Sequence, residues 1–527
     1  MEKADIKKDW LIAMALAFIC LAGTIIFFHP VLNSDDDVFL MYKLAGGYGD
    51  TPTNLLHYDH ILHPWLGYIL STLFTWLPHL NWYSWFFIGC QFFSWILIGR
   101  SLLFLLERPK AIGVFLLLFL LGGINGLQSL NMTSTTWMLS LAVSVYLVCF
   151  PKAILFCFVL LLISGSIRLQ VPLMVLALFI PLQWIKGSVA RWKPLFFLVA
   201  VSASFFLLNY TQKKYYEQHI PGWKAEERMK QDLFYAFNRP KNFEKPDSLI
   251  FQDSTEKAFY NRLFLYDDSF PSPNRIKNIS RSITRIRDLS QKEDKEELYW
   301  TWVAWRLYLL YALVAILLAW KQAVLLSWLK RAWLPVLSIL LFYIFLFVFL
   351  KFTDAFFIGI ILMIALQLVL LWPKQPRAPA SVYLPAILFL LPLTWSLNRD
   401  IQNDKHYRAA SLQFKCGVEE LKLHKQQLFI ATGDALPVNF FPFNEVPADH
   451  SLENYVYKER LLTRSYFNSF RKYGLTGNLK MEITAPVLRF AGPYFPELLN
   501  WAGADSLFFS ATDSNFHCLE IRKLLVK

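Results

Sequence analysis

Apolar windows of about 20 residues recur along most of this 527-residue chain. A helix needs roughly that many apolar residues to cross the ~30 Å core of a bilayer. Hydrophobic residues make up 55% of the chain, charged residues 17%, and the mean hydropathy is +0.37. The sequence therefore predicts an all-α polytopic membrane protein of about 11 transmembrane helices. We place these spans at residues 10–29, 82–106, 111–127, 132–150, 152–166, 170–185, 193–209, 299–319, 333–351, 355–373 and 381–397.

The net charge of +13 is distributed in a way that indicates a membrane orientation. With the N-terminus cytoplasmic, the short basic clusters between spans all fall inside, as the positive-inside rule requires. This distribution argues against nucleic-acid binding. The apolar run near the N-terminus shows no cleavage site, so we expect an uncleaved first span. The absence of eukaryotic targeting features fits a bacterial inner (plasma) membrane. The clusters are Lys3, Lys7 and Lys8; Arg108 and Lys110; Lys186, Arg191 and Lys193; Lys321, Lys330 and Arg331; and Lys374 and Arg377.

This orientation divides the chain into a transmembrane core, 1–397, and an extracytoplasmic C-terminal domain, 398–527. The core carries two external loops, at about 30–81 and 210–298. Within the C-terminal domain, helix-like spacing over 418–427 precedes a strand-like Leu428–Ala431, which predicts a small α/β domain. Its cysteines, Cys416 and Cys518, are candidates for a disulfide if the domain faces an oxidising compartment.

The apolar segment 61–77 is too short to be counted as a span, and counting it would move every later basic cluster to the outside. We therefore expect an interfacial or half-inserted helix there. An acidic run, Asp35 to Asp37, directly follows the first span. Ser34 is a natural N-cap, and carboxylates are favoured in a first helical turn, so a helix should begin here and end at Gly46-Gly47.

The same acidic run has a chemical interpretation. A carboxylate on a rigid helix start can act as a general base toward a bound hydroxyl group, and Asp35 or Asp36 are our candidates. Three histidines, His57, His60 and His63, follow in the same loop. Zinc is conceivable there, but the spacing matches no metal signature. Donors or cations for a phosphate-bearing ligand suit these histidines better.

Taken together, these motifs resemble the GT-C membrane glycosyltransferases. The likeness lies in an acidic motif directly after the first span, followed by a surface-lying helix. The motifs are Ser34-Asp-Asp, Gly46-Gly-Tyr-Gly-Asp-Thr-Pro, His63-Pro-Trp-Leu-Gly-Tyr-Ile-Leu, Asn81-Trp-Tyr, Gln128-Ser-Leu-Asn-Met-Thr and Ile167-Arg168. In architecture the resemblance extends to about residue 397, and in motif it is concentrated in 33–83.

The resemblance implies transfer of a sugar from a polyprenyl-phosphate or polyprenyl-diphosphate carrier to a lipid, glycan or protein acceptor on the outer face. The leaving phosphate would need cations or donors. Arg168, Lys351, His57, His60 and His63 are the candidates. Some family members bind a divalent metal, for which Asp36, Asp267 and Asp268 are candidate ligands. No other cofactor is implied. Many relatives carry an arginine-valine pair near the position of Thr353-Asp354, and this chain has none.

Three alternatives remain open. A polysaccharide polymerase or ligase of the O-antigen type would place arginines in a large late loop, where this chain has Arg281, Arg285 and Arg287. A multi-span transporter should show charged residues and broken helices inside the spans, often in two similar halves, whereas the interior charge here is sparse and no repeat is evident. A catalytically inactive scaffold would keep its function without Asp35 and Asp36.

Overall fold

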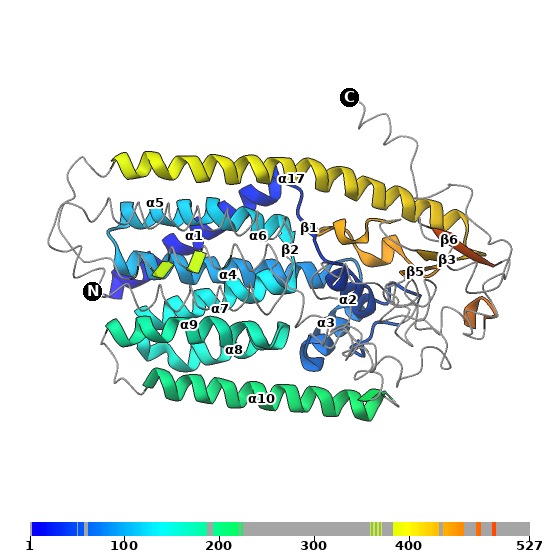
Figure 1. Ribbon diagram of the computed structural model, residues 1–527, viewed down its shortest axis with the longest axis horizontal. Helices are drawn as coiled ribbons and strands as arrows, with labels where there is room; N and C mark the ends of the chain where they lie inside the picture. The colour runs from blue at the N-terminus through cyan, green and yellow to red at the C-terminus, as the bar shows by residue number, and fades with distance from the viewer. Residues whose placement is uncertain are drawn as a thin grey trace, which may run out of the picture.

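The computed structural model describes residues 3–49, 51–56, 62–186, 193–220, 223–224, 359, 362–363, 366–367, 370, 383–431, 436–457, 471–475 and 487–491. Most of these residues are helical, with a few short strands. The helices align side by side into an elongated bundle, and the strands gather at the end of the bundle opposite the N-terminus (Figure 1).

The bundle is organised around α7 (Met132–Cys149), in which every residue is buried. It packs against α4 (Trp82–Leu105), α8 (Ile154–Ile167) and α9 (Gln170–Lys186). A helix buried on all sides has no polar solvent face, so hydroxyl groups on it find their partners inside the protein where they are paired. Ser140 Oγ does so with Thr136 O at 2.7 Å and Ser164 Oγ at 2.8 Å.

The outer helices are α1 (Lys3–Phe27) and α10 (Lys193–His219), and they present apolar side chains outward. Phe18 and Ile26 on α1 are 64% and 73% exposed, and Phe196 and Phe206 on α10 are 72% and 73% exposed. Contiguous exposed apolar surface of this kind suits contact with lipid. The protein therefore has the surface of a membrane protein.

Within the described residues, five helices are long and apolar enough to cross a membrane: Ile6–Phe27, Trp82–Leu105, Arg108–Gln128, Met132–Cys149 and Pro194–His219. These five correspond to expected spans. Two further expected spans appear as the shorter apolar helices Pro151–Ile167 and Gln170–Leu182. The expected spans at 299–319 and 333–351, and most of 355–373, lie outside the described residues.

The third span is not a single regular helix. It consists of α5 (Arg108–Leu118), a π-helical turn (Phe119–Gly123) and α6 (Ile124–Gln128). The amide of Ile124 reaches back to the carbonyl of Phe119, five residues earlier. Such π-helical turns within α-helices are frequently found at functional sites. This one lies against α17, close to a cavity described below.

Beyond the bundle, α2 (Asp35–Ala45) and α3 (Pro64–Trp76) pack against each other (Figure 1). The expected helix at 61–77 is thus α3. One face of it, including Leu66 and Phe74, is buried, whereas Tyr68 and Trp76 are 64% and 74% exposed. Its first turn is fixed to the end of α8, because Trp65 Nε1 donates to Ser166 Oγ at 2.9 Å.

Two small sheets complete the described structure. β1 (Val31–Leu32) pairs in parallel with β2 (Ser129–Leu130) and antiparallel with β4 (Phe441–Pro442). β3 (Leu428–Ala431), where a strand was expected, pairs in parallel with β5 (Tyr455–Tyr457) and β6 (Leu488–Ala491). The first sheet joins the chain just after α1 to the start of α7 and to the C-terminal segment.

The long helix α17 (Tyr383–Leu423) runs the length of the molecule (Figure 1). Its 41 residues span about 60 Å at 1.5 Å per residue, about twice the thickness of a bilayer core. The boundary that the sequence places between 397 and 398 falls inside this helix. Because apolar residues give way to polar ones without a helix breaker at that point, the helix continues across it.

Candidate functional site

The acidic run forms the first turn of α2, which begins at Asp35. Ser34 occupies the N-cap position with an extended backbone, but its side chain makes no capping bond to the helix amides, which corrects the expectation. Its hydroxyl group bonds to the Asp37 carboxyl group instead. The helix ends as expected: Gly46 has φ 75°, a left-handed conformation that glycine adopts without strain.

Asp37 is the buried member of the run, at 1% exposure. Its Oδ1 accepts hydrogen bonds from Tyr83 Oη at 2.7 Å and from the Met132 amide at 2.9 Å. The second bond satisfies one of the unpaired amides at the start of α7. Burial raises the pKa of Asp37 to about 7, with the bond from Tyr83 opposing the shift and the charge of Asp36 adding to it. Asp37 therefore joins the starts of α2, α4 and α7.

Asp36 is half-buried on the same turn of α2 and lies within electrostatic range of Arg168. Arg168 directly follows α8, and its Nη1 donates to Thr133 Oγ1 in the first turn of α7. Burial lowers the pKa of Arg168, and the charges of Asp36 and Asp37 oppose that shift. Two residues singled out separately in the sequence, a carboxylate and an arginine, are thus brought to one place. We call Asp36, Asp37, Thr133 and Arg168 the acidic site.

The side chain of Asp35 and the whole of His57, His60, Lys351, Asp267, Asp268 and Cys518 lie outside the described residues, so the roles expected of them remain expectations. Cys416 is half-buried on α17. Among the residues that the structure describes, no three His, Cys, Asp or Glu side chains are grouped so as to hold a metal ion.

His63 caps a helix. Its Nδ1 accepts from the Trp65 amide at 3.3 Å, which makes it the N-cap of α3. Its Nε2 then carries the proton and faces Leu208 O at 3.2 Å and Thr211 Oγ1 at 3.3 Å on α10. Burial lowers the pKa of His63, consistent with a neutral ring. Because both ring nitrogens are engaged within the protein, His63 holds α3 against α10.

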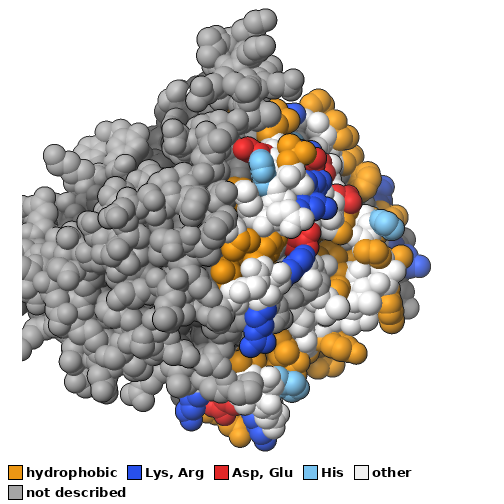
Figure 2. Space-filling view, turned by 90° about the vertical axis from the view of Figure 1, so that its right-hand side faces the viewer, with side chains coloured by type: hydrophobic (Ala, Val, Ile, Leu, Met, Phe, Trp, Pro, Cys, Tyr) orange, Lys and Arg blue, Asp and Glu red, His pale blue; other side chains and the backbone are white. Residues whose placement is uncertain are grey.

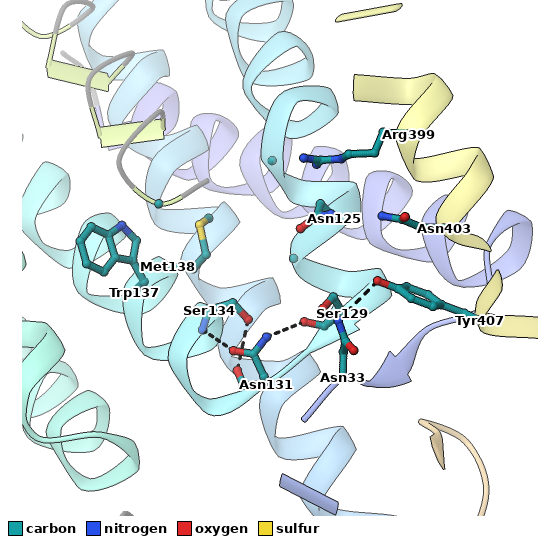
Figure 3. Close-up of a pocket in the computed structure, with 13 residues that line it drawn as sticks. Asn33, Asn125, Ser129, Asn131, Ser134, Trp137, Met138, Arg399, Asn403 and Tyr407 are labelled. Atoms are coloured by element: carbon teal, nitrogen blue, oxygen red, sulfur yellow. Dashed lines mark hydrogen bonds between the residues drawn. The ribbon is translucent and has the colours of Figure 1, made fainter. Parts of the chain in front are cut away.

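A cavity of about 200 Å³ lies beside the start of α7, where Asn131 and Ser134 line it (Figure 3). Asn33 Nδ2 donates to Ser129 Oγ at 2.7 Å and to Tyr407 Oη at 3.4 Å along its wall. Asn131 Oδ1 accepts from the Ser134 amide at 2.8 Å and caps α7. The lining residues are Asn33, Gly122, Asn125, Gly126, Ser129, Asn131, Ser134, Trp137, Met138, Gly359, Arg399, Asn403 and Tyr407.

Sequence reasoning missed this cavity, and it missed Asp37 as the buried carboxylate. The cavity residues of α17 do have a sequence pattern from which a polar helical face could have been predicted. Arg399, Asn403 and Tyr407 recur every four residues, which places polar groups on one helical face immediately after an apolar stretch. No comparable signal separates Asp37 from its neighbours, because its partners Tyr83 and Met132 are distant in the chain.

Figure 2 shows the end of the molecule that carries α2, α3 and the sheet β5-β3-β6. Acidic, basic and apolar side chains are interspersed over its described part. Glu445 is paired with Lys415 and with His450, whose Nε2 lies 2.9 Å from Glu445 Oε2. Tyr42 Oη donates to His450 O at 2.7 Å, so α2 is also fastened to the C-terminal segment.

The acidic site therefore combines a half-buried carboxylate, a guanidinium group and a rigid support. This arrangement can accept a proton from a hydroxyl group and stabilise an anion beside it. No protein-family model matches the chain, and neither does any curated protein or solved structure.

Proposed function

We propose that this protein is a membrane glycosyltransferase that transfers a sugar from a polyprenyl-phosphate-linked donor to a lipid, glycan or protein acceptor. The observation that carries the proposal is the placement of Asp36 at a helix start within electrostatic range of Arg168. The resemblance of the first loop to the GT-C glycosyltransferases supports the same reaction.

In the proposed reaction, Asp36 is the base. The acceptor hydroxyl oxygen bonds to the anomeric carbon of the sugar, and the hydroxyl proton passes to the Asp36 carboxylate. The bond between the anomeric carbon and the phosphate oxygen breaks, and its electron pair leaves with the polyprenyl phosphate. Arg168 stabilises the negative charge on that phosphate. Asp37 accepts hydrogen bonds from Tyr83 and from the Met132 amide, and these bonds hold the start of α2 against the start of α7.

The proposal includes a finer architecture. We infer about 11 spans, with the N-terminus cytoplasmic and the acidic site on the outer face of a bacterial inner membrane. Residues 398–527 then form an extracytoplasmic α/β domain. The parallel sheet β5-β3-β6 and the extension of α17 beyond the thickness of a bilayer support this arrangement.

The test is sugar transfer from a radiolabelled pool of polyprenyl-phosphate sugars by purified protein in lipid. Asp36→Asn should reduce transfer at least 100-fold, and Asp35→Asn should be assayed beside it. Asp449→Asn is the matched control, because Asp449 is exposed on the C-terminal segment and outside the acidic site.

If the wild type transfers sugar and the Asp35→Asn, Asp36→Asn and double variants do so equally well, the chemistry lies elsewhere. Absence of transfer from every donor in the pool would favour a polymerase or a transporter. Each variant is first checked for a wild-type melting temperature, so that loss of fold is not mistaken for loss of chemistry.

A further inference from the structure

The cavity beside the acidic site has walls rich in amide groups. Asn33, Asn125, Asn131 and Asn403 come to it from three parts of the chain (Figure 3). Part of this amide capacity is used within the protein: Asn33 Nδ2 and Asn131 Oδ1 make the bonds described above, Asn131 Nδ2 donates to Ser129 O at 3.0 Å, and Asn125 bonds to the Asp400 carboxyl group. The Asn403 amide and the amide oxygens of Asn33 and Asn125 remain to donate to or accept from a ligand. A ligand that matches such walls must also donate and accept from neighbouring atoms, which is a property of hydroxyl groups on a ring.

The charge of the cavity disfavours an anion. Among the lining residues only Arg399 carries a charge. The neighbouring Asp400 is fully buried, and its Oδ1 lies 3.5 Å from Arg399 Nη2. Burial raises the pKa of Asp400 to about 6, and its pairing with Arg399 opposes that shift. The paired carboxyl group lies beside the one charged side chain of the lining and reduces its attraction for an anion. A phosphate or carboxylate would therefore find little net positive charge here.

The shape of the cavity favours one ring. Its volume of about 200 Å³ is below the ~300–1,000 Å³ of pockets for drug-sized ligands. Gly122 and Gly126, one helical turn apart, leave part of the wall without side chains. Trp137 and Met138 lie at the end away from Asn33 and close it with buried apolar side chains (Figure 3).

We propose that this cavity binds a single neutral sugar ring, held by the Asn403 amide and by the amide oxygen of Asn125, with Trp137 and Met138 closing the apolar end. Its walls are continuous with the acidic site, because Asn33 precedes the N-cap of α2 and Asn131 precedes Met132, whose amide binds Asp37. That the bound ring is part of the acceptor rests on the proposed function. The binding itself does not, since it requires no transfer.

Binding is measured on the full chain in lipid nanodiscs by saturation-transfer NMR, with methyl glycosides of common hexoses and pentoses as probes and inorganic phosphate as a competitor. At least one methyl glycoside should bind, and Asn403→Ala should weaken its binding at least tenfold. Gln402→Ala is the matched control: Gln402 is the neighbouring residue of α17, exposed and outside the cavity, and its loss should leave binding unchanged.

A second measurement needs no variant. A diazirine-bearing form of the bound glycoside should label the peptides that contain Trp137 or Asn403. The proposal is overturned if no glycoside binds, if Asn403→Ala leaves binding unchanged, if the label falls elsewhere, or if phosphate displaces the glycoside. Asp36→Asn should still bind the glycoside, so a failure of transfer and a failure of this cavity assignment give different results.

Discussion

Tyr83 donates its phenolic hydrogen to Oδ1 of Asp37 at 2.7 Å, and both side chains are buried. This bond joins the first turn of α4 to the first turn of α2, across 46 residues of sequence. Because the same oxygen also accepts the Met132 amide, three helix starts share a single carboxylate oxygen.

The first prediction concerns the pH dependence of stability. The pKa of Asp37 is about 7 in the folded protein, against an ordinary value of 3.8. Between these values the folded state binds more protons than the unfolded state, so stability falls as pH rises from about 4 to about 7, by up to about 1.4 kcal/mol per pH unit. Asp37→Asn keeps an acceptor oxygen and should flatten this slope in thermal melts. Asp449→Asn should retain it, and an unchanged slope in Asp37→Asn would contradict the assignment.

The second prediction concerns Tyr83 itself. Tyr83→Phe removes a donor from a buried carboxyl group and should cost about 1–3 kcal/mol of unfolding free energy at neutral pH. Because the bond from Tyr83 lowers the pKa of Asp37, its loss should also move the midpoint of the pH dependence upward. In an Asp37→Asn background the upward shift should vanish. A shift that persists there would show that Tyr83 acts through another group.

The third prediction concerns the proposed anion-stabilising group. Arg168→Gln should lower kcat by about 10²–10³-fold, the usual effect of removing one donor from a developing anion. Arg168→Lys keeps the charge and should recover part of the rate. Thr133→Val removes the partner that orients the guanidinium group and should have a smaller effect. Transfer kinetics with Asp449→Asn as the reference check this. Equal rates for Arg168→Gln and the reference would exclude Arg168 from the reaction.

The fourth prediction separates the two ends of the bundle. Asp9, near the start of α1, is 3% exposed. Its Oδ2 lies 3.4 Å from Arg100 Nη1, and its Oδ1 lies 3.3 Å from Arg108 Nε. Asp9→Ala leaves the buried Arg100 without its partner and should destabilise the protein by about 3–5 kcal/mol. Transfer per folded molecule should be unchanged, because α1 begins at the end of the bundle opposite α2 (Figure 1). Chemical unfolding in detergent and a folded-fraction assay measure the two effects.

The fifth prediction concerns α3 as an interfacial helix. A spin label at the exposed Ile69 should show shallow immersion, with accessibility to both oxygen and a water-soluble relaxation agent. The control label replaces Gln402, an exposed position on α17. Purely aqueous accessibility at residue 69 would show that α3 lies off the membrane.

Local signals in the sequence predict much of what the structure shows. The glycine that ends α2, the strand β3, the interfacial length of α3 and five of the expected spans all follow from patterns within a few tens of residues. Membrane-spanning helices are especially easy to predict from a sequence, because the bilayer constrains both their length and their composition.

What the sequence did not predict depends on distant partners. Asp37 differs from Asp36 only in facing Tyr83 and the start of α7, and the roles of Ser34 and His63 likewise follow from their neighbours in space. The cavity needs Asn33 and Tyr407 to meet across 374 residues. No local pattern specifies such a meeting, since it is the packing of α17 along the bundle that creates it.

The position of β1 between β2 and β4 has a consequence for how the protein is made. Leu32 pairs with Phe441, so the edge of the sheet beside the acidic helix stays open while roughly 400 further residues are synthesised, on the order of 20–80 s at typical translation rates. A chain interrupted before β4 would insert its first helices yet lack the third strand. Closure of this sheet, and the fastening of the chain after α1 to the C-terminal segment, is thereby postponed until β4 has left the ribosome.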